Sequence, residues 1–493
     1  MLCMFSAILS SILGKKASKY LVRTVLAAVV VLSAVLLWYT FSNDLSYVYY
    51  MGHFPAPWGN EIRGGCLEAI FALFVSIIAL MAVLGGDRAV SEDVEGKKQN
   101  LFYILTCLMT SSLLAMCYTN DLFTAYVFIE INTIAGCGLI MVRQLGKAVA
   151  TAIRYMVISL LGSGLFLIGV TLLYTITGHL LMSNIQDSIA VMNVSGAYSK
   201  QLTVIVGLMT VGLGIKSGMY PFHLWIPEAY GQSNVASSML LSSVVSKGYI
   251  FLLIKIYFRV IGFDVITKSG VMNIAFVFGI AGMIMGSVMA IREKSLRRMI
   301  AYSSVAQIGY IYMGIGIGSK EGMVAAVFHI FAHGLSKALL FLSSSEFTEG
   351  SHTKSVDDIR GMGRRYKFSS LCFALAAFSI VGFPLLAGFI SKLMLGSAAM
   401  DGGIKQWAAL VALGISTILN VLYFLRVVVL LYSDAGERNA QESDGPGTIA
   451  MNTYHGGAWF RIASIILVAL NFVLGLGSAA IIDIIQKGIE MFS

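Results

Sequence analysis

Seven ionisable side chains stand inside runs of apolar residues, where groups of these types can carry protons. They are Glu130, Lys216, Lys247, His329, His333, Lys337 and Lys392. A charged side chain at the middle of a bilayer costs at least about 2.5–3.5 kcal/mol, so a set of seven is not incidental. Burial favours the neutral forms of lysine and glutamate. A group whose neutral and charged forms are close in free energy can both accept and release a proton. Together these residues predict a proton relay.

The spacing of three of these residues supports the relay. His329, His333 and Lys337 follow one another at intervals of four, which places them on one face of a helix. Hydroxyl groups that stand near the lysines in the sequence are candidate links through water, and they belong to Ser242, Ser243, Ser246 and Ser336. His223 fits a structural role as well as a supporting role in the relay.

Other interpretations of the same residues stay open. Glu130 and Lys216 fit a purely structural ion pair as well as a proton-carrying one. His329 and His333 have a spacing that suits a metal, but no acidic or sulfur ligand stands near them in the sequence, so no metal site is expected.

The composition indicates which elements must position these residues. Of 493 residues, 57% are hydrophobic and 12% are charged, whereas a soluble protein carries roughly a quarter charged residues. The charged residues are too few to cover a globule in water, so the outer surface is expected to face lipid. The many glycines (50) and few prolines (6) suit closely packed helices in a bilayer.

Apolar runs long enough to cross a bilayer recur along the whole chain. A spanning helix needs about 20 mostly apolar residues, and about fourteen runs meet or approach that length. The runs are continuous rather than alternating, which predicts an all-α polytopic membrane protein. The candidate spans are residues 2–14, 21–41, 66–85, 101–119, 121–142, 155–178, 202–218 with a continuation to about 230, 235–257, 271–291, 299–318, 322–346, 369–398, 406–431 and 459–485.

Two runs carry residues that interrupt a helix. The segment 216–227 contains Pro221, and the segment 382–392 contains Pro384. Proline removes an intrahelical hydrogen bond and glycine loosens the turn. Irregular backbone inside a bilayer is tolerated only where protein buries it or water reaches it. Both segments are therefore predicted to be discontinuous helices, and their separation by five spans fits repeated five-span units.

The net charge of +9 is explained by basic residues in the loops between the spans. Basic residues gather in alternate loops, which is the positive-inside pattern and places both termini outside. Nucleic acid is therefore not an expected partner. Lys255 and Lys405 stand near span ends and are expected to extend to the interface, and Arg426 is interpreted as structural.

The remaining polar segments predict no separate domain and no cofactor site. The stretches 86–100, 347–368 and 433–457 are too short to fold alone, residues 53–59 suggest a surface hairpin, and 179–200 suggest an amphipathic connector. The six cysteines include no CxxC pair, so they are interpreted as packing residues rather than ligands of a cluster or zinc.

Several motifs resemble the antiporter-like family, which includes large membrane-arm subunits of respiratory complex I, membrane subunits of energy-converting hydrogenases, and the A and D subunits of Mrp cation/proton antiporters. The motifs are Phe128-Ile-Glu130, Ile215-Lys-Ser-Gly-Met-Tyr-Pro-Phe-His-Leu-Trp-Ile-Pro-Glu-Ala-Tyr230, Ala301-Tyr-Ser-Ser-Val-Ala-Gln-Ile-Gly-Tyr310, Phe328-His-Ile-Phe-Ala-His-Gly-Leu-Ser-Lys-Ala-Leu-Leu-Phe341 and Gly388-Phe-Ile-Ser-Lys392. The chain departs from the pattern after Tyr230, where the usual proline is missing, and at Pro384, which stands alone. Its short length and its 54–60 loop look most like the D-type subunit.

The resemblance implies fourteen helices with two inverted five-helix repeats and breaks in helices seven and twelve. On this basis the chain divides into helices 1–3 (residues 1–100), a first repeat (101–258), a second repeat (269–432) and a polar loop with the last helix (433–493). By motif position, Glu130 matches the helix-five glutamate of the family and Lys216 its helix-seven lysine. The other matches are Lys247 in helix eight, His329, His333 and Lys337 in helix eleven, and Lys392 in helix twelve.

The resemblance also implies a function. The expected protein is a proton-translocating subunit of a multisubunit complex in the cell membrane, either an Mrp-type antiporter or a redox-driven hydrogenase or NADH-quinone oxidoreductase. Its partners would be other integral membrane subunits, protons and Na⁺, with no cofactor in this chain. A self-contained cation/proton antiporter is the alternative, and a purely structural membrane subunit is a third interpretation.

Overall fold

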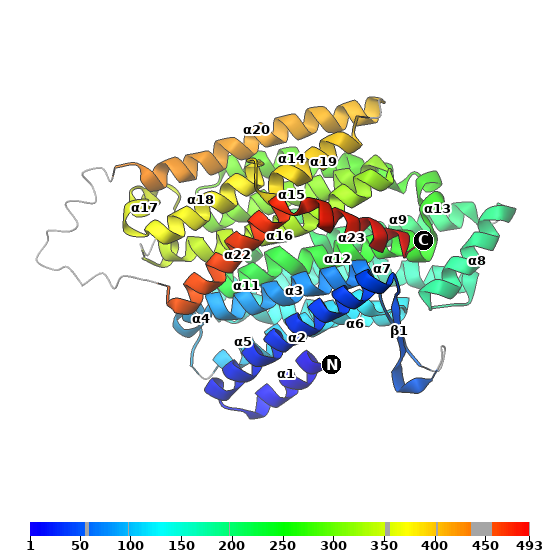
Figure 1. Ribbon diagram of the computed structural model, residues 1–493, viewed down its shortest axis with the longest axis horizontal. Coiled ribbons are helices and arrows are strands. Elements are labelled where there is room, and N and C mark those ends of the chain that lie inside the picture. The colour runs from blue at the N-terminus through cyan, green and yellow to red at the C-terminus, as the bar shows by residue number, and fades with distance from the viewer. Residues whose placement is uncertain are drawn as a thin grey trace, which may run out of the picture.

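The computed structural model describes residues 1–54, 59–96, 98–196, 198–350 (side chains to 348), 355–400, 403–434 and 456–492. Within them the chain is a bundle of helices that run side by side along the longest axis (Figure 1). Twelve helices in this part of the chain are long and apolar enough to cross a membrane. The predicted all-α polytopic architecture is therefore confirmed.

The helices follow one another with short connections, and one β-hairpin stands at an end of the bundle. In chain order the elements are α1 (Leu2–Ile12), α2 (Lys15–Asn43), β1 (Tyr47–Tyr50), η1 (Met51–His53), β2 (Glu61–Gly64), α3 (Cys66–Gly85), α4 (Asp87–Asp93), α5 (Gln99–Tyr118), α6 (Leu122–Met141), α7 (Gly146–Thr177), α8 (Met182–Ser195), α9 (Ser199–Ser217), η2 (Phe222–Leu224), α10 (Trp225–Gln232), α11 (Val235–Leu240), η3 (Leu241–Val245), α12 (Ser246–Lys255), η4 (Ile256–Ile261), α13 (Phe263–Ser269), α14 (Val271–Arg292), α15 (Leu296–Ile317), α16 (Lys320–Gly350), η5 (Asp357–Ile359), α17 (Met362–Arg365), α18 (Lys367–Val381), α19 (Ala387–Ala398), α20 (Ile404–Tyr432), α22 (Ala458–Leu476) and α23 (Ser478–Glu490).

The predicted spans correspond to these elements, but two runs predicted as single spans do not form one full-length helix. The run 2–14 forms α1, whose 11 residues are fewer than the about 20 that a full crossing needs. The run 459–485 is divided at Gly477, so α22 forms its first, apolar part and α23 is a separate helix. The connector 179–200 contains α8, and β1 pairs with β2 around the expected hairpin. Residues 55–58 and 435–455 of the predicted loops lie outside the described residues.

The first predicted break is present where α9 ends. Gly218 has φ +80°, and a Cβ at this position would lie 2.1 Å from Ile226 Cδ1, so both the conformation and the space require glycine. The chain then turns through Pro221 and η2 before α10 resumes the crossing. Lys216 therefore lies in the last turn of a helix that stops inside the bundle.

The second break separates α18 from α19. Gly382 has φ +99°, and the non-glycine residue Leu385 also has a positive φ of 72°. A Cβ on Gly388 would lie 1.7 Å from the carbonyl oxygen of Ser379, so the two halves pack too closely for any other residue. Lys392 follows one turn later, as predicted.

Residues 235–261 form one continuous buried helix with two wider turns. The π-helical segments η3 and η4 flank α12, and η3 ends just before Ser246 and Lys247. Such segments often mark functional positions because they displace the side chains that follow them. The helix runs through Ile261, so it ends four residues later than the predicted span 235–257.

The middle of the bundle is made by the helices that carry most of the candidate residues. The apolar windows of the helix 235–261 and of α16 are 100% buried, and that of α15 is 94% buried. The outer helices α2, α7 and α20 are 22%, 39% and 33% buried, so most of their side chains face outward. Four of the seven candidate residues, namely Lys247, His329, His333 and Lys337, are thus held by the most enclosed helices.

The basic loops meet at one end of the bundle. Lys19 and Arg23 of α2 pair with Asp87 at 2.6 and 3.1 Å, and Arg143 pairs with Asp93 at 2.9 Å. In Figure 1 this is the end where α4 and α17 lie, opposite the end with β1, α8 and α13. We call it the basic end.

Candidate functional site

Glu130 and Lys216 are the only carboxylate and amine of the predicted relay that lie within ion-pair distance among the described residues. Lys216 Nζ is 3.8 Å from Glu130 Oε1, and it donates a shorter hydrogen bond of 2.6 Å to Thr133 Oγ1. The Lys216 side chain is fully buried, whereas that of Glu130 is 22% exposed. Glu130 Oε1 has no hydrogen-bond partner in the described chain. The two groups are therefore close but loosely joined.

Aromatic and amide groups hold Lys216 on its inner side. Its Nζ lies 5.5 Å from the ring centre of Tyr249 on α12, a distance at which a cation is attracted to the ring. The Tyr249 hydroxyl donates to Asn132 Oδ1 at 3.0 Å, and the Asn132 amide donates to Ser112 Oγ at 3.0 Å. On the side of the break, Trp225 Nε1 donates to the Ile215 carbonyl at 3.3 Å. The position of Lys216 is thus fixed by α5, α6, α10 and α12.

Lys247 lies deeper and is bonded only to a neutral group. It is fully buried, and its Nζ donates to the carbonyl oxygen of Ser242 in η3, which the wider turn makes available. Ser246 was predicted to link the lysines, but its hydroxyl is 2.9 Å from the Tyr230 hydroxyl instead.

His329, His333 and Lys337 share one face of α16, as their spacing predicts. The rings of His329 and His333 stack with centroids 6.1 Å apart. His329 Nδ1 is 2.9 Å from Ser391 Oγ, and neither ring nitrogen of His333 has a hydrogen-bond partner among the described residues. Lys337 Nζ donates to the Ile300 carbonyl at 2.7 Å and to Ser303 Oγ. His333 also lies near enough to Lys247 and Lys337 to experience their charges.

Lys392 ends the series at the second break. Its Nζ donates to the Val381 carbonyl at 2.8 Å and to Thr417 Oγ1 at 3.3 Å. It lies 5.2 Å from the ring centre of Tyr310, and that ring stacks on His329 with centroids 5.4 Å apart. The break, α16 and α20 are therefore joined around this lysine.

Two supporting predictions have different outcomes. His223 is buried in η2 beside Tyr220, with ring centroids 5.2 Å apart, and neither of its ring nitrogens has a hydrogen-bond partner among the described residues. Ser336 does not bond to a lysine: its hydroxyl donates to Ser379 Oγ and Asn471 Oδ1, both at 3.0 Å. Ser336 thus faces α18 and α22.

The bonds of Lys247, Lys337 and Lys392 decide what these groups can do. Their amines bond to carbonyls and hydroxyls, and none of the ion pairs among the described residues includes them. A buried ammonium without a counter-charge is costly, whereas a neutral amine bonded in this way is not. Carbonyl and hydroxyl oxygens can accept from an ammonium or from a neutral amine, which suits a relay with water between its members.

One buried ionic group was missed by the sequence interpretation. Glu68 at the start of α3 accepts from Arg259 Nη1 at 2.7 Å and from the Gly65 amide at 2.9 Å, and Lys255 Nζ lies 3.7 Å from it. Lys255 also donates to the carbonyls of Cys117 and Thr119, each at 2.7 Å. The prediction that Lys255 extends to the interface is therefore wrong. The four-residue spacing of Lys255 and Arg259, in a helix that continues past residue 258, was the sequence pattern that could have indicated this group.

Two other basic residues, Lys405 and Arg426, have partners near the surface of the molecule. Lys405 donates to Asn273 Oδ1 at 2.8 Å in a solvent-accessible position. Arg426 pairs with Asp357 at 2.8 Å, and both side chains are exposed. Neither joins the buried series.

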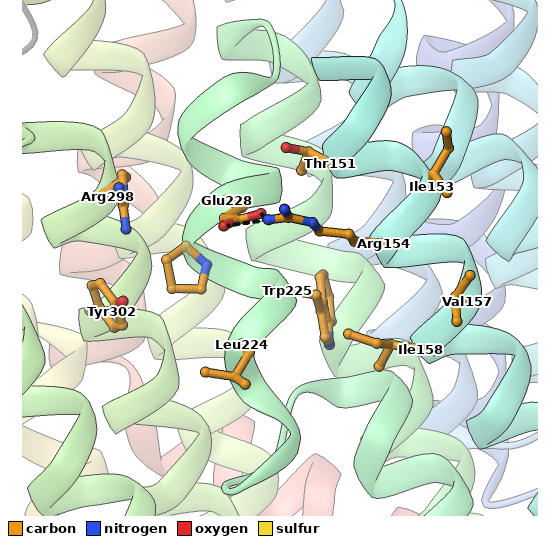
Figure 2. A pocket seen from close by; sticks show the side chains of 11 residues that line it. Thr151, Ile153, Arg154, Val157, Ile158, Leu224, Trp225, Glu228, Arg298 and Tyr302 are labelled. Carbon is orange, nitrogen blue, oxygen red and sulfur yellow. Dashed lines mark hydrogen bonds and ion pairs between the residues drawn. The ribbon is translucent and has the colours of Figure 1, made fainter. Parts of the chain in front are cut away.

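A crevice of about 520 Å³ opens beside the first break (Figure 2). Arg154 of α7 lies across it and donates both to Glu228 Oε1 at 3.0 Å and to Glu228 Oε2 at 2.8 Å. Trp225 lines the crevice, and its indole N–H also donates to the Ile215 carbonyl at the end of α9. Within the described residues no group of three or more His, Cys, Asp and Glu side chains is arranged to hold a metal ion.

Comparison with known proteins gives one family. Residues 119–419 match the family described as NADH:quinone oxidoreductase/Mrp antiporter, TM. The chain is 31% identical to NADH-quinone oxidoreductase subunit N of Desulforudis audaxviator, over 82% of this chain and 79% of that protein. It is 24% identical to the D-type subunit of the Na(+)/H(+) antiporter of Alkalihalophilus pseudofirmus, over 87% and 83% of the two chains.

A solved structure shares the whole fold. A chain of the membrane-bound sulfane sulfur reductase, an archaeal respiratory membrane complex, superposes with a TM-score of 0.86 over 99% of this chain and 95% of that chain, at 24% identity. The resemblance inferred from the motifs is confirmed, and so is the fold. The specific likeness to a D-type subunit is not singled out, because the identity to the N-type relative is higher.

Proposed function

Because this chain belongs to the NADH:quinone oxidoreductase/Mrp antiporter transmembrane family, we propose that it is a proton-translocating subunit of a multisubunit membrane complex. One observation carries the proposal. Lys247, Lys337 and Lys392 are buried in the bundle, and among the described residues their amines donate hydrogen bonds only to neutral oxygen atoms. A structural ion pair needs a counter-charge, whereas a group that changes its charge during a cycle needs partners that tolerate both states.

The Glu130–Lys216 pair would act as a gate for this series. At 3.8 Å the carboxylate stabilises the ammonium of Lys216, and the last carbonyls of α9 add to this stabilisation. Moving Glu130 away, or protonating it, would weaken the hold on the proton, which would pass inward toward Lys247. The loose contact favours this role because a small displacement suffices.

From Lys247 the proton would pass along α16 to the second break. His333 lies close to Lys247 and Lys337. The ring of His329 stacks on Tyr310, whose ring also contacts Lys392, and His329 Nδ1 is within hydrogen-bond distance of Ser391 Oγ. Water would bridge the steps between these groups, because their nitrogen atoms include unpartnered ones at His329 and His333. In this proposal Lys392 delivers the proton toward the second half-channel.

The setting proposed for the chain follows from its family and its charges. We place it in the cell membrane among other integral membrane subunits, with the basic end inside and both termini outside. Residues 101–258 and 269–432 would be the two inverted repeats, since each contains one broken helix. Protons are the proposed cargo, and Na⁺ would be exchanged if the complex is an antiporter.

Replacement of Lys216 tests the proposal. In a complex shown to assemble normally, Lys216→Ala should abolish proton translocation, measured with a pH-sensitive dye in inverted membrane vesicles. Lys405→Ala is the matched control, because that lysine lies outside the buried series. Normal translocation by Lys216→Ala would refute the proposed role.

A self-contained cation/proton antiporter is the second candidate. Glu130 favours it, because its carboxylate is partly exposed and has an oxygen without a hydrogen-bond partner among the described residues. Such a group can alternate between a proton and a cation. Proteoliposomes that contain this chain alone discriminate: sodium-driven proton flux would support this candidate, and its absence would support a subunit that needs its partners.

A further inference from the structure

Three helices carry five polar residues and one cysteine at the same interval along one seam. In α16 they are Ser336 and Ser343, in α18 Ser379 and Cys372, and in α22 Asn471 and Ser464. Each pair is separated by seven residues, which is about two helical turns or roughly 10 Å and returns to the same face. All six side chains are buried, and the three helices contact one another (Figure 1).

The first level of the seam lies at the second helix break. The hydroxyl of Ser336 donates to Ser379 Oγ and to Asn471 Oδ1, and Ser379 also donates to Asn471 Oδ1, each at 3.0 Å. Ser379 Oγ accepts from the amide of Gly388 at 3.4 Å on the far side of the break. Lys392 bonds to Val381, two residues beyond Ser379. The seam therefore starts beside the last lysine of the proposed path.

The second level continues the seam toward the basic end. Ser343, Cys372 and Ser464 lie two turns from the first level on their helices, and because α16 runs opposite to α18 and α22, all three steps go in the same direction. Ser464 Oγ is fully buried and has no hydrogen-bond partner among the described residues. A hydroxyl in this state is a place where water completes the bonding.

The third level is a buried carboxylate. Glu346 lies one turn beyond Ser343 and is 6% exposed. Its Oε1 accepts from the amide of Gly456, just before α22, at 2.6 Å, and its Oε2 accepts from Ser369 Oγ at the start of α18. None of the ion pairs among the described residues includes Glu346. Its titratable neighbours are the thiol of Cys372 and the phenol of Tyr366.

We propose that this seam is a second proton route, in which Glu346 receives a proton at the basic end and passes it through water along Ser343, Ser464 and Ser379 toward Lys392. The inference rests on the proposed function and deepens it, because it assigns a basic-end carboxylate to the second half of the chain. The step is a proton transfer only: the Glu346 carboxylate gains a proton at the basic end and loses it to the adjacent water, and the Lys392 amine gains one at the break.

Helix packing alone explains the hydrogen bonds of the first level, at Ser336, Ser379 and Asn471. It does not explain why the carboxylate of Glu346 is buried at the last level. Small polar residues commonly join helices in membranes through bonds such as those of Ser336 and Asn471. The carboxylate of Glu346 also joins α16 to Ser369 and Gly456, but a charged carboxylate buried without a cation costs free energy that a neutral side chain in its place would not. Glu346 lies at one end of the seam and Lys392 lies beside the other end, which favours a role in moving protons.

Glu346→Gln tests the route, because glutamine keeps the shape and the acceptor oxygen but cannot titrate. In the assembled complex it should reduce proton translocation by about tenfold or more, whereas Glu346→Asp should restore part of it. Ser464→Ala should reduce it by a smaller factor, and Ser433→Ala, which removes an exposed hydroxyl outside the seam, is the matched control. Infrared difference spectra recorded between the resting and the translocating complex should lose a carboxyl band in Glu346→Gln.

The outcomes separate this inference from the proposed function. Normal translocation by Glu346→Gln together with loss in Lys216→Ala would overturn the seam and leave the lysine path intact. Normal translocation by both variants would overturn the proposed function itself. Loss of complex assembly in Glu346→Gln, with full activity per assembled complex, would assign Glu346 a purely structural role and overturn the route.

Discussion

Two buried groups of ionisable residues in this chain use the same residue types in opposite ways. In the Glu68–Lys255–Arg259 cluster, the carboxylate and guanidinium are 2.7 Å apart and Lys255 has two further carbonyl partners. In the series Lys247, Lys337 and Lys392, the amines have carbonyl and hydroxyl partners, and no carboxylate of the described part of the chain pairs with them. The cluster is bonded for one charge state, whereas the series tolerates two. Burial alone therefore does not identify a proton-carrying residue; the charge of its partners does.

The largest expected effect is the loss of proton translocation when a lysine of the series is replaced. Lys247→Met should reduce proton translocation by about a hundredfold or more, because it removes a group that must accept the proton. It should leave thermal stability unchanged or raised, since an unpaired buried amine is replaced by an apolar side chain of similar length. Dye-based flux and thermal unfolding of the purified complex measure both. Loss of stability together with flux would instead indicate a structural role for Lys247.

The cluster should give the reverse result. Glu68→Ala removes the carboxylate that compensates Arg259 and Lys255, so the free energy of unfolding should fall by about 3–5 kcal/mol. Translocation per assembled complex should stay close to that of the parent protein. Unfolding in detergent, followed by intrinsic fluorescence, measures the first quantity. If flux per complex collapsed while stability was unchanged, the cluster would belong to the path and the comparison would fail.

The second break sharpens the comparison because it positions Lys392. Gly388→Ala would bring a Cβ within 1.7 Å of the Ser379 carbonyl, so the two halves of the break must separate. A loss of about 1–3 kcal/mol in stability is expected, as for overpacking of a core, with reduced flux. Gly414→Ala is the matched control, since a Cβ there meets nothing within 4 Å. Equal behaviour of the two variants would show that the break does not constrain the path.

The smallest effect is expected at the surface. Arg154 pairs with Glu228 across the crevice of Figure 2, but its side chain is 68% exposed. Arg154→Ala should therefore change stability by no more than about 1 kcal/mol and leave translocation unaltered. A large loss of flux would mean that the outer wall of the first break takes part in gating.

The sequence predicted the helix breaks and the candidate residues because both depend on local rules. Gly218, Pro221, Gly382 and Pro384 interrupt helices whatever packs around them, and a lysine within an apolar run is visible without a structure. The spacing of His329, His333 and Lys337 likewise fixed their common face.

The errors arose where packing between distant segments decides. Lys255 stands near the end of an apolar run, but η4 extends the helix and Glu68, 187 positions earlier, meets it inside the bundle. The partners of Ser336 likewise depend on packing, because its hydroxyl faces α18 and α22 although Lys337 is its neighbour in the sequence; its supporting role stays a prediction. The polar seam was equally hidden, because its seven-residue spacing has meaning only once three helices are known to adjoin.

A matched pair of lysine-to-arginine substitutions tests the central claim most directly. Arginine remains protonated in proteins, so it can serve as a counter-charge but cannot release a proton. In the assembled complex, Lys247→Arg should abolish proton flux, whereas Lys255→Arg, beside Glu68, should retain it. Normal flux with Lys247→Arg would contradict the account, because it would show that this buried lysine does not need to change its charge.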